Sequence, residues 1–146
     1  MQGGVNILPL PSVLIVEDEQ SIRDVLVELF DVDGVIVESA GTLEAAKAFL
    51  GRRSFDLIVT DIRLGGRRDG GLQVIAAAGL LSPEATVIAL TAYPDDDHRC
   101  ASIRLGATHF LEKPVSLETL AGLASRAGVP TVMLPMPVGV TGLASR

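Results

Sequence analysis

Five short apolar runs, most of them rich in β-branched residues, recur along the chain and restrict it to few folds. They occupy residues 13–16, 35–37, 57–60, 86–90 and the weaker 109–111. Each run is too short for a helix and is apolar at consecutive positions, as expected for parallel strands covered on both faces. The sequence therefore predicts five buried strands in a parallel sheet.

The segments between these runs have the spacing of amphipathic helices. The apolar positions of the first two segments are Ile22, Val25, Leu26 and Leu29, and then Leu43, Ala46 and Leu50. Three further helices are expected at residues 71–78, 95–105 and 117–127. The glycines expected to end the five helices are Gly34, Gly51, Gly79, Gly106 and Gly128. Strict alternation of strand and helix predicts a doubly wound α/β sandwich of five parallel strands and five helices.

The composition argues against several classes of function. Hydrophobic residues make up 48% of the 146 residues but aromatic residues only 3%, so aliphatic side chains must fill the core. The net charge is −6, whereas affinity for a nucleic-acid backbone needs clustered lysine and arginine. We therefore expect no direct binding of nucleic acid, and we expect cations or basic proteins as partners.

The chain length favours one compact domain with short tails. We expect an N-terminal extension over residues 1–11, one domain over residues 12–127, and a proline-broken apolar tail over residues 128–146 that is no output domain. Cys100 is the only cysteine, which excludes an internal disulfide. No stretch reaches the ~20 apolar residues of a membrane span, and no secretory leader is evident. These features predict a soluble cytoplasmic protein.

Reactive side chains follow four of the five predicted strands. Glu17 and Asp18 follow the first run, Asp61 the third, Thr91 the fourth and Lys113 the fifth. The carboxyl ends of parallel strands meet at one edge of a sheet, so these side chains should lie together. A single acid after a strand is ordinarily a helix cap or part of a turn. Three carboxylates gathered at one edge, however, predict a divalent cation, with Mg2+ as the best candidate.

Four motifs, VLIVEDE, LIVTDIRL, VIALTAY and FLEKP, occur in that order within residues 12–127. They resemble the ordered motifs of the response-regulator receiver family and are similar to those of its single-domain chemotaxis regulators. The resemblance implies a flavodoxin-like fold and a phosphoacceptor of a two-component phosphorelay. Such a domain takes a phosphoryl group from a sensor histidine kinase or phosphotransfer protein onto Asp61. It is a switch and not an enzyme, with at most slow autodephosphorylation.

Under this resemblance the acidic residues hold the metal and receive the phosphoryl group. The Asp61 carboxylate attacks phosphorus and forms an acyl phosphate, which is covalent nucleophilic chemistry. Asp18, Asp61 and the main-chain carbonyl of Arg63 are expected to bind Mg2+, with Glu17 contributing through water. The metal would neutralise the oxygens of the transferred group.

The residues after the fourth and fifth strands are expected to contact the phosphoryl oxygens and report on them. Thr91 supplies a hydroxyl and Lys113 a positive charge. The resemblance also implies a cis bond between Lys113 and Pro114. Phe110 matches the family's switch aromatic, although an ordinary core ring is an equal alternative. The implied docking surface for a downstream protein comprises the fourth helix, fifth strand and fifth helix.

The sequence departs from the family between Leu64 and Leu72, where it reads GGRRDGG. The family usually has a shorter loop there, so we expect a longer, flexible one, and we hypothesise that it and Arg63 tune the lifetime of the phosphoryl group. Tyr93 either limits access of water to that group or packs on the fourth helix. His98 and His109 lack a matching set of metal ligands, and ordinary packing or exposure is expected for both.

The sequence also allows three alternatives to a stand-alone receiver. The chain could be a receiver module from a longer regulator or hybrid kinase, or a degenerate receiver that only binds. A Mg2+-dependent phosphohydrolase also uses aspartates at strand ends. It would need a second acid two residues after the nucleophile, where this chain has Arg63, and a substrate cap, for which no insertion is present.

Overall fold

The computed structural model describes residues 9–134. Its parallel strands form one sheet in the order β2-β1-β3-β4-β5. The strands are β1 (Ser12–Val16), β2 (Ile36–Ala40), β3 (Leu57–Asp61), β4 (Thr86–Thr91) and β5 (His109–Glu112). The helices are α1 (Gln20–Leu29), α2 (Leu43–Leu50), α3 (Gly70–Leu81), α4 (Asp96–Arg104) and α5 (Leu117–Arg126). The predicted flavodoxin-like doubly wound fold is confirmed.

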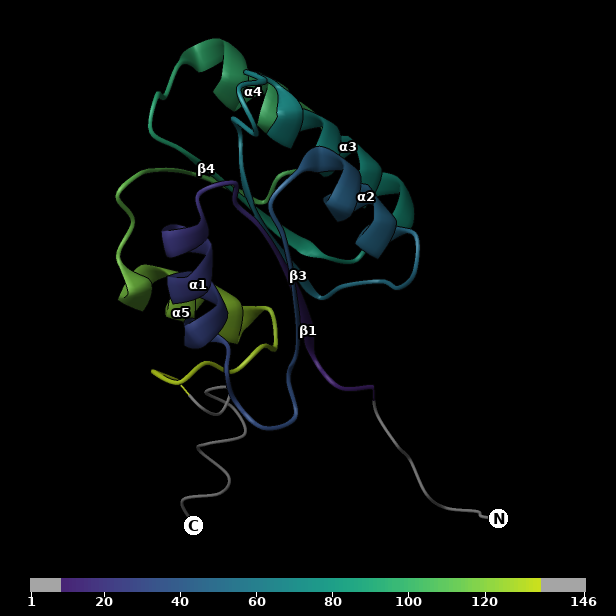
Figure 1. The fold of residues 1–146 in the computed structure, drawn as a ribbon, viewed down its shortest axis with the longest axis vertical. Helices are drawn as coiled ribbons and strands as arrows, with labels where there is room; N and C mark the ends of the chain where they lie inside the picture. Colours follow the sequence, from purple (N-terminus) through teal and green to yellow (C-terminus); the bar gives the residue numbers. More distant parts are fainter. Residues whose placement is uncertain (1–8, 135–146) are drawn as a thin grey trace.

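Alternate side chains of each inner strand build two cores, one on each face of the sheet. Val13 and Ile15 of β1 join the core formed with α1 and α5, whereas Leu14 and Val16 join the core formed with α2 and α3. Successive strand residues point to opposite faces, so consecutive apolar residues are needed where both faces are covered. Figure 1 shows α1 beside α5 on one side of the strands, and α2 with α3 on the other.

Main-chain hydrogen bonds continue one residue beyond the strands at the carboxyl edge of the sheet. The N–H groups and the carbonyls that accept from them are Glu17 and Ala40 (3.0 Å), Ile62 and Leu90 (2.9 Å), and Lys113 and Thr91 (2.8 Å). The loops that follow β1, β3 and β5 therefore leave the sheet from fixed points. These hydrogen bonds fix the backbone positions of Glu17, Ile62 and Lys113, at or beside the reactive side chains.

The helix boundaries differ from the sequence prediction mainly at α3. This helix continues to Leu81, so Gly79 lies inside it and does not end it. Gly34 is also not a helix stop, because α1 ends at Leu29 and Gly34 belongs to the turn before β2. Gly106 and Gly128 do follow α4 and α5, with φ of +115° and +83°. Such positive angles favour glycine.

The segment after α5 turns back to the end of α1. The N–H of Val132 donates to the carbonyl of Leu29 (2.9 Å), and the buried Thr131 Oγ1 accepts from the N–H groups of Met133 and Leu134 (3.2 and 3.0 Å). Residues 129–134 are thus fixed on the body. The rest of the predicted proline-broken tail and most of the N-terminal extension lie outside the described residues. None of the helices in residues 9–134 has the length and apolar character needed to cross a membrane.

Candidate functional site

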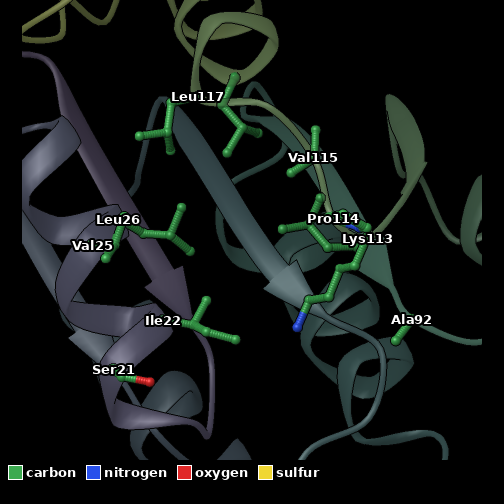
Figure 2. A pocket seen from close by; sticks show the side chains of 11 residues that line it. Ser21, Ile22, Val25, Leu26, Ala92, Lys113, Pro114, Val115 and Leu117 are labelled. Atoms are coloured by element: carbon green, nitrogen blue, oxygen red, sulfur yellow. The ribbon is translucent and has the colours of Figure 1, made fainter.

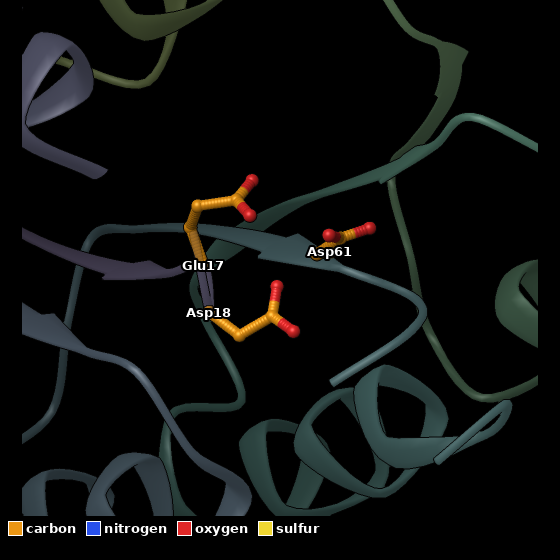
Figure 3. A group of neighbouring side chains, drawn as sticks. All are labelled: Glu17, Asp18 and Asp61. Atoms are coloured by element: carbon orange, nitrogen blue, oxygen red, sulfur yellow. The ribbon is translucent and has the colours of Figure 1, made fainter. Parts of the chain in front are cut away.

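Three carboxylates predicted to meet at the edge of the sheet do so (Figure 3). Glu17 and Asp18 follow β1 directly, and Asp61 is the last residue of β3. Each can place a carboxylate oxygen within 4.8 Å of the other two. Glu17 is 2% exposed and Asp61 8%, whereas Asp18 is open to solvent. The cluster therefore has two buried acids and one exposed acid.

Lys113 forms ion pairs with both buried acids. Its Nζ lies 2.9 Å from Glu17 Oε1 and 3.0 Å from Asp61 Oδ2. The Lys113–Pro114 peptide bond after β5 is cis, as the resemblance implies. The second oxygen of Glu17, Oε2, accepts the N–H of Glu19 at 3.1 Å. Both oxygens of Glu17 are thus already engaged by groups of the protein.

The cluster has one positive charge beside three carboxylates. Burial raises the pKa of Glu17 and of Asp61, and the hydrogen bonds from Lys113 offset this only in part. Burial alone would lower the pKa of Lys113, but its hydrogen bonds to the two acids prevail and raise it. One ammonium group cannot compensate two buried carboxylates beside a third. This donor set and charge fit a divalent cation that prefers oxygen ligands.

The loop after β3 contains a tight, hydrogen-bonded turn near its start. Leu64 and Arg67 exchange two main-chain hydrogen bonds of 3.0 and 2.9 Å across Gly65 and Gly66. Both glycines have positive φ, 55° and 82°, as a two-residue hairpin turn requires. The N–H of Gly65 donates to Asp18 Oδ2 at 3.0 Å. The glycine-rich insertion thus supplies a hydrogen-bond donor to Asp18, the exposed acid of the cluster.

Thr91, Tyr93 and Arg63 lie on the loops next to the cluster. Thr91 is the last residue of β4 and is 2% exposed. Its Oγ1 accepts the N–H of Tyr93 at 3.1 Å. The guanidinium of Arg63 lies over the Tyr93 ring, 4.5 Å from its centroid. Tyr93 therefore packs against the loop that follows β3, an arrangement that the sequence did not indicate.

Phe110 occupies β5 and is half-buried. Its ring packs at the border of the core formed with α2 and α3. This position suits either of the roles considered for it, so its role as a switch stays a prediction.

His98 joins two helix N-termini, a contact that sequence reasoning missed. Its Nε2 lies 3.1 Å from Asp69 Oδ1, and its Nδ1 lies 3.0 Å from Asp95 Oδ2. Asp69 and Asp95 immediately precede α3 and α4. The only sequence signal was the spacing of Asp95 and His98, three residues apart at a helix start. Nothing in the sequence pointed to Asp69.

A pocket of about 600 Å3 lies beside the site, between α1 and the segment that connects β5 to α5. Figure 2 shows Ile22, Val25 and Leu26 lining it from α1, opposite Pro114 and Val115. The pocket is apolar, and the stem of Lys113 forms part of its wall.

Known proteins share both the sequence motifs and this fold. Residues 13–124 match the family described as response regulator receiver domain. The alginate biosynthesis transcriptional regulatory protein AlgB of Pseudomonas aeruginosa is 32% identical over 114 residues, which are 78% of this chain and 25% of AlgB. The chain belongs to the response regulator receiver family. It is a phosphoacceptor domain of two-component systems by family, and it spans about a quarter of the length of AlgB.

Solved structures share this fold. A response regulator receiver domain protein (CheY-like) from Methanospirillum hungatei superposes with a TM-score of 0.74 at 27% identity, over 80% of this chain and 92% of that chain. A response regulator protein from Burkholderia pseudomallei superposes with a TM-score of 0.70 at 24% identity, over 92% of this chain and 71% of that chain. That crystal contains a phosphorylated aspartic acid, a calcium ion and citrate. At this identity the second likeness shows the fold alone.

Proposed function

We propose that Asp61 accepts a phosphoryl group from a histidine kinase or phosphotransfer protein, and that the phosphorylated domain then docks on a downstream protein. The observation that carries this proposal is the convergence of Asp61, Glu17, Asp18 and Lys113 within one cluster. A structural ion pair needs only one acid and one base. Here the buried carboxylates outnumber the one ammonium group beside them. Such an excess at the ends of strands indicates a functional site that binds a further charged group.

Within this proposal each residue has a defined task. The Asp61 carboxylate forms a bond to phosphorus while the bond from phosphorus to the donor nitrogen breaks. Lys113 then exchanges its contact with Asp61 Oδ2 for the arriving phosphoryl oxygens, and Glu17 keeps the ammonium in place. The Thr91 hydroxyl donates to the same oxygens. Asp61, Thr91 and Lys113 are thus the reacting and contacting residues.

The acid cluster also suits a metal ion. Asp18, Asp61 and the main-chain carbonyl of Arg63 are our proposed ligands of Mg2+, which would neutralise charge on the phosphoryl oxygens. Glu17 is better placed to act through water, because both of its oxygens already accept hydrogen bonds. The response regulator protein from Burkholderia pseudomallei contains a calcium ion. For this chain, the divalent cation and the choice of Mg2+ are our proposal.

The test of the proposal is covalent labelling. Incubation with acetyl phosphate and Mg2+ is expected to add one phosphoryl group, measured by intact mass. Asp61→Asn should show no adduct, because an amide is not a nucleophile for this step. Asp56→Asn, immediately before the same strand, is the matched control and should still be labelled. Absence of an adduct on the unsubstituted chain would favour a domain that only binds partners.

A phosphohydrolase would instead release phosphate from the donor in many turnovers. Arg63 stands where that chemistry needs a second acid, so we propose a switch with at most slow autodephosphorylation. The downstream partner is proposed to dock on α4, β5 and α5, with Phe110 and Thr91 as the switch. Binding of nucleic acid by this chain is not proposed, although AlgB carries the name of a transcriptional regulator.

The stacked Arg63 and Tyr93 should protect the acyl phosphate. They extend from the loops after β3 and β4, next to Asp61 and Thr91, where water must approach. Arg63→Ala is expected to shorten the half-life of phosphorylated Asp61 by about two- to five-fold, the equivalent of a cation–π contact of about 0.5–1 kcal/mol. The measurement is loss of the adduct with time by intact mass. Arg67→Ala, in the same loop, is the control, and equal half-lives for all three proteins would reject the idea.

A further inference from the structure

Arg23 lies on α1 outside the set of residues predicted to act at the site, yet it contacts that set directly. Its Nη1 donates a hydrogen bond to the main-chain carbonyl oxygen of Glu17 at 2.8 Å. The side chain is half-buried, and within residues 9–134 it forms no salt bridge. Its guanidinium is therefore used for the backbone between the two acids, and not for pairing with a surface carboxylate.

The Glu17 backbone is held on both sides. Its N–H donates to the carbonyl of Ala40 at 3.0 Å, and its carbonyl accepts from Arg23. The carbonyl of Glu17 and the N–H of Asp18 belong to one planar peptide unit. A hydrogen bond to this carbonyl therefore fixes the orientation of the peptide plane that carries Cα of Asp18.

Gly41 provides the space for this guanidinium. A Cβ atom on Gly41 would lie 2.8 Å from Arg23 Nη1 and 3.5 Å from its Cζ. The three nearest heavy atoms outside the adjacent residues all belong to Arg23, and Gly41 is not among the glycines with positive φ. Alanine at position 41 would thus displace the Arg23 head group while leaving the backbone and every charge unchanged.

We infer that Arg23 is a positioning residue for the metal site, which acts by fixing the Glu17–Asp18 peptide and depends on the space left by Gly41. This inference rests on the proposed function, since it assumes that the acid cluster binds a divalent cation. Groups that orient metal ligands commonly contribute about 10- to 100-fold to metal affinity. For Arg23, Coulomb repulsion of the cation opposes this contribution, so its removal tests two effects at once.

The experiment is a double-substitution cycle with Mg2+ affinity as the readout, measured by calorimetric titration on the full chain. Gly41→Ala is expected to weaken Mg2+ binding about ten-fold, because it keeps all charges and displaces only the guanidinium. In an Arg23→Met background the same Gly41→Ala change should have no effect. Arg23→Lys, which retains a charged donor, should recover part of the affinity lost in Arg23→Met. Arg53→Met, an exposed arginine after α2, is the control and should bind Mg2+ as the unsubstituted chain does.

Two further measurements keep the outcomes distinct. In the metal-free protein, the amide proton resonance of Asp18 should shift in both Gly41→Ala and Arg23→Met, because each removes the hydrogen bond on the Glu17 carbonyl. Thermal unfolding shows whether any variant is misfolded. Equal effects of Gly41→Ala in both backgrounds, or unchanged affinity in all variants, would overturn the role of Arg23. Failure of the unsubstituted chain to bind Mg2+ would instead overturn the metal site of the proposed function.

Discussion

Gly71→Ala should destabilise the protein by about 3 kcal/mol or more, near the upper end of what overpacking causes. A Cβ at position 71 would lie 1.9 Å from the carbonyl oxygen of Asp61 and 2.6 Å from Cα of Ile62. Both are main-chain atoms, so no change of rotamer can relieve the contact. The start of α3 must move away from the edge of the sheet and lose the 2.7 Å hydrogen bond from the Gly71 N–H to the Ile62 carbonyl.

The matched control for this substitution lies in α5. A Cβ on Gly122 would meet no atom within 4 Å, so Gly122→Ala should raise stability by about 0.5–1 kcal/mol. Urea unfolding followed by circular dichroism measures both variants. Because the contact is made with the main chain of Asp61, Gly71→Ala should also lower the yield of phosphorylated protein. A loss of stability no larger than about 0.5 kcal/mol would show that α3 can move from the sheet at little cost.

The fold was predictable because its signal is local and repeated. Both-faced burial makes the inner strands apolar at consecutive positions, and one-faced burial gives the helices their spacing of three and four residues. Gly79 shows where this reasoning fails. A glycine in a helix is a weak stop, and packing of Val74, Ile75 and Ala78 in the core carries α3 past it to Leu81.

Side chains at the ends of strands were predictable for a topological reason. Parallel strands place their carboxyl ends at one edge, so Glu17, Asp61 and Lys113 had to meet once the strands were assigned. Arg23, Gly71 and His98 were missed, because their roles come from contacts between helices, loops and strands that no sequence periodicity encodes. Gly71, for example, resembles any other glycine near the start of a helix until the 1.9 Å approach to the Asp61 carbonyl is known.

The glycine-rich insertion was predicted as a flexible loop for a similar reason. Gly65 and Gly66 permit many conformations, and composition alone does not select one. The turn is selected by the main-chain pairing of Leu64 with Arg67, by burial of Leu64 and by the hydrogen bond of Gly65 to Asp18. The last of these contacts spans 47 residues of sequence. Local sequence reasoning has no access to partners at that separation.

Lys113→Met should destabilise the metal-free protein by about 2–4 kcal/mol at neutral pH, because it leaves Glu17 and Asp61 buried without their shared counter-ion. The sign of the pH dependence follows from the carboxyls. Their folded-state pKa values lie above the ordinary 4.5 and 3.8, so the folded state retains protons that the unfolded state has lost. Stability from these groups therefore falls as pH rises from about 4 through the raised pKa values.

Removal of Lys113 takes away the hydrogen bonds that lower both carboxyl pKa values, so the fall in stability should become larger and extend to higher pH. The difference between the two proteins should be small below about pH 4, where the carboxyls are protonated in both. It should grow as pH rises through the raised carboxyl pKa values, and then stay constant until the Lys113 pKa, raised above its ordinary 10.5, is approached. Urea unfolding in the presence of a metal chelator measures this difference across pH. Lys47→Met, an exposed lysine on α2, is the control and should show no such profile.

Adding Asp61→Asn to Lys113→Met should recover much of the lost stability at neutral pH, since only one buried carboxylate then lacks a counter-ion. A difference that is independent of pH from about 4 to 8 would mean that packing of the lysine stem, and not its charge, stabilises the site.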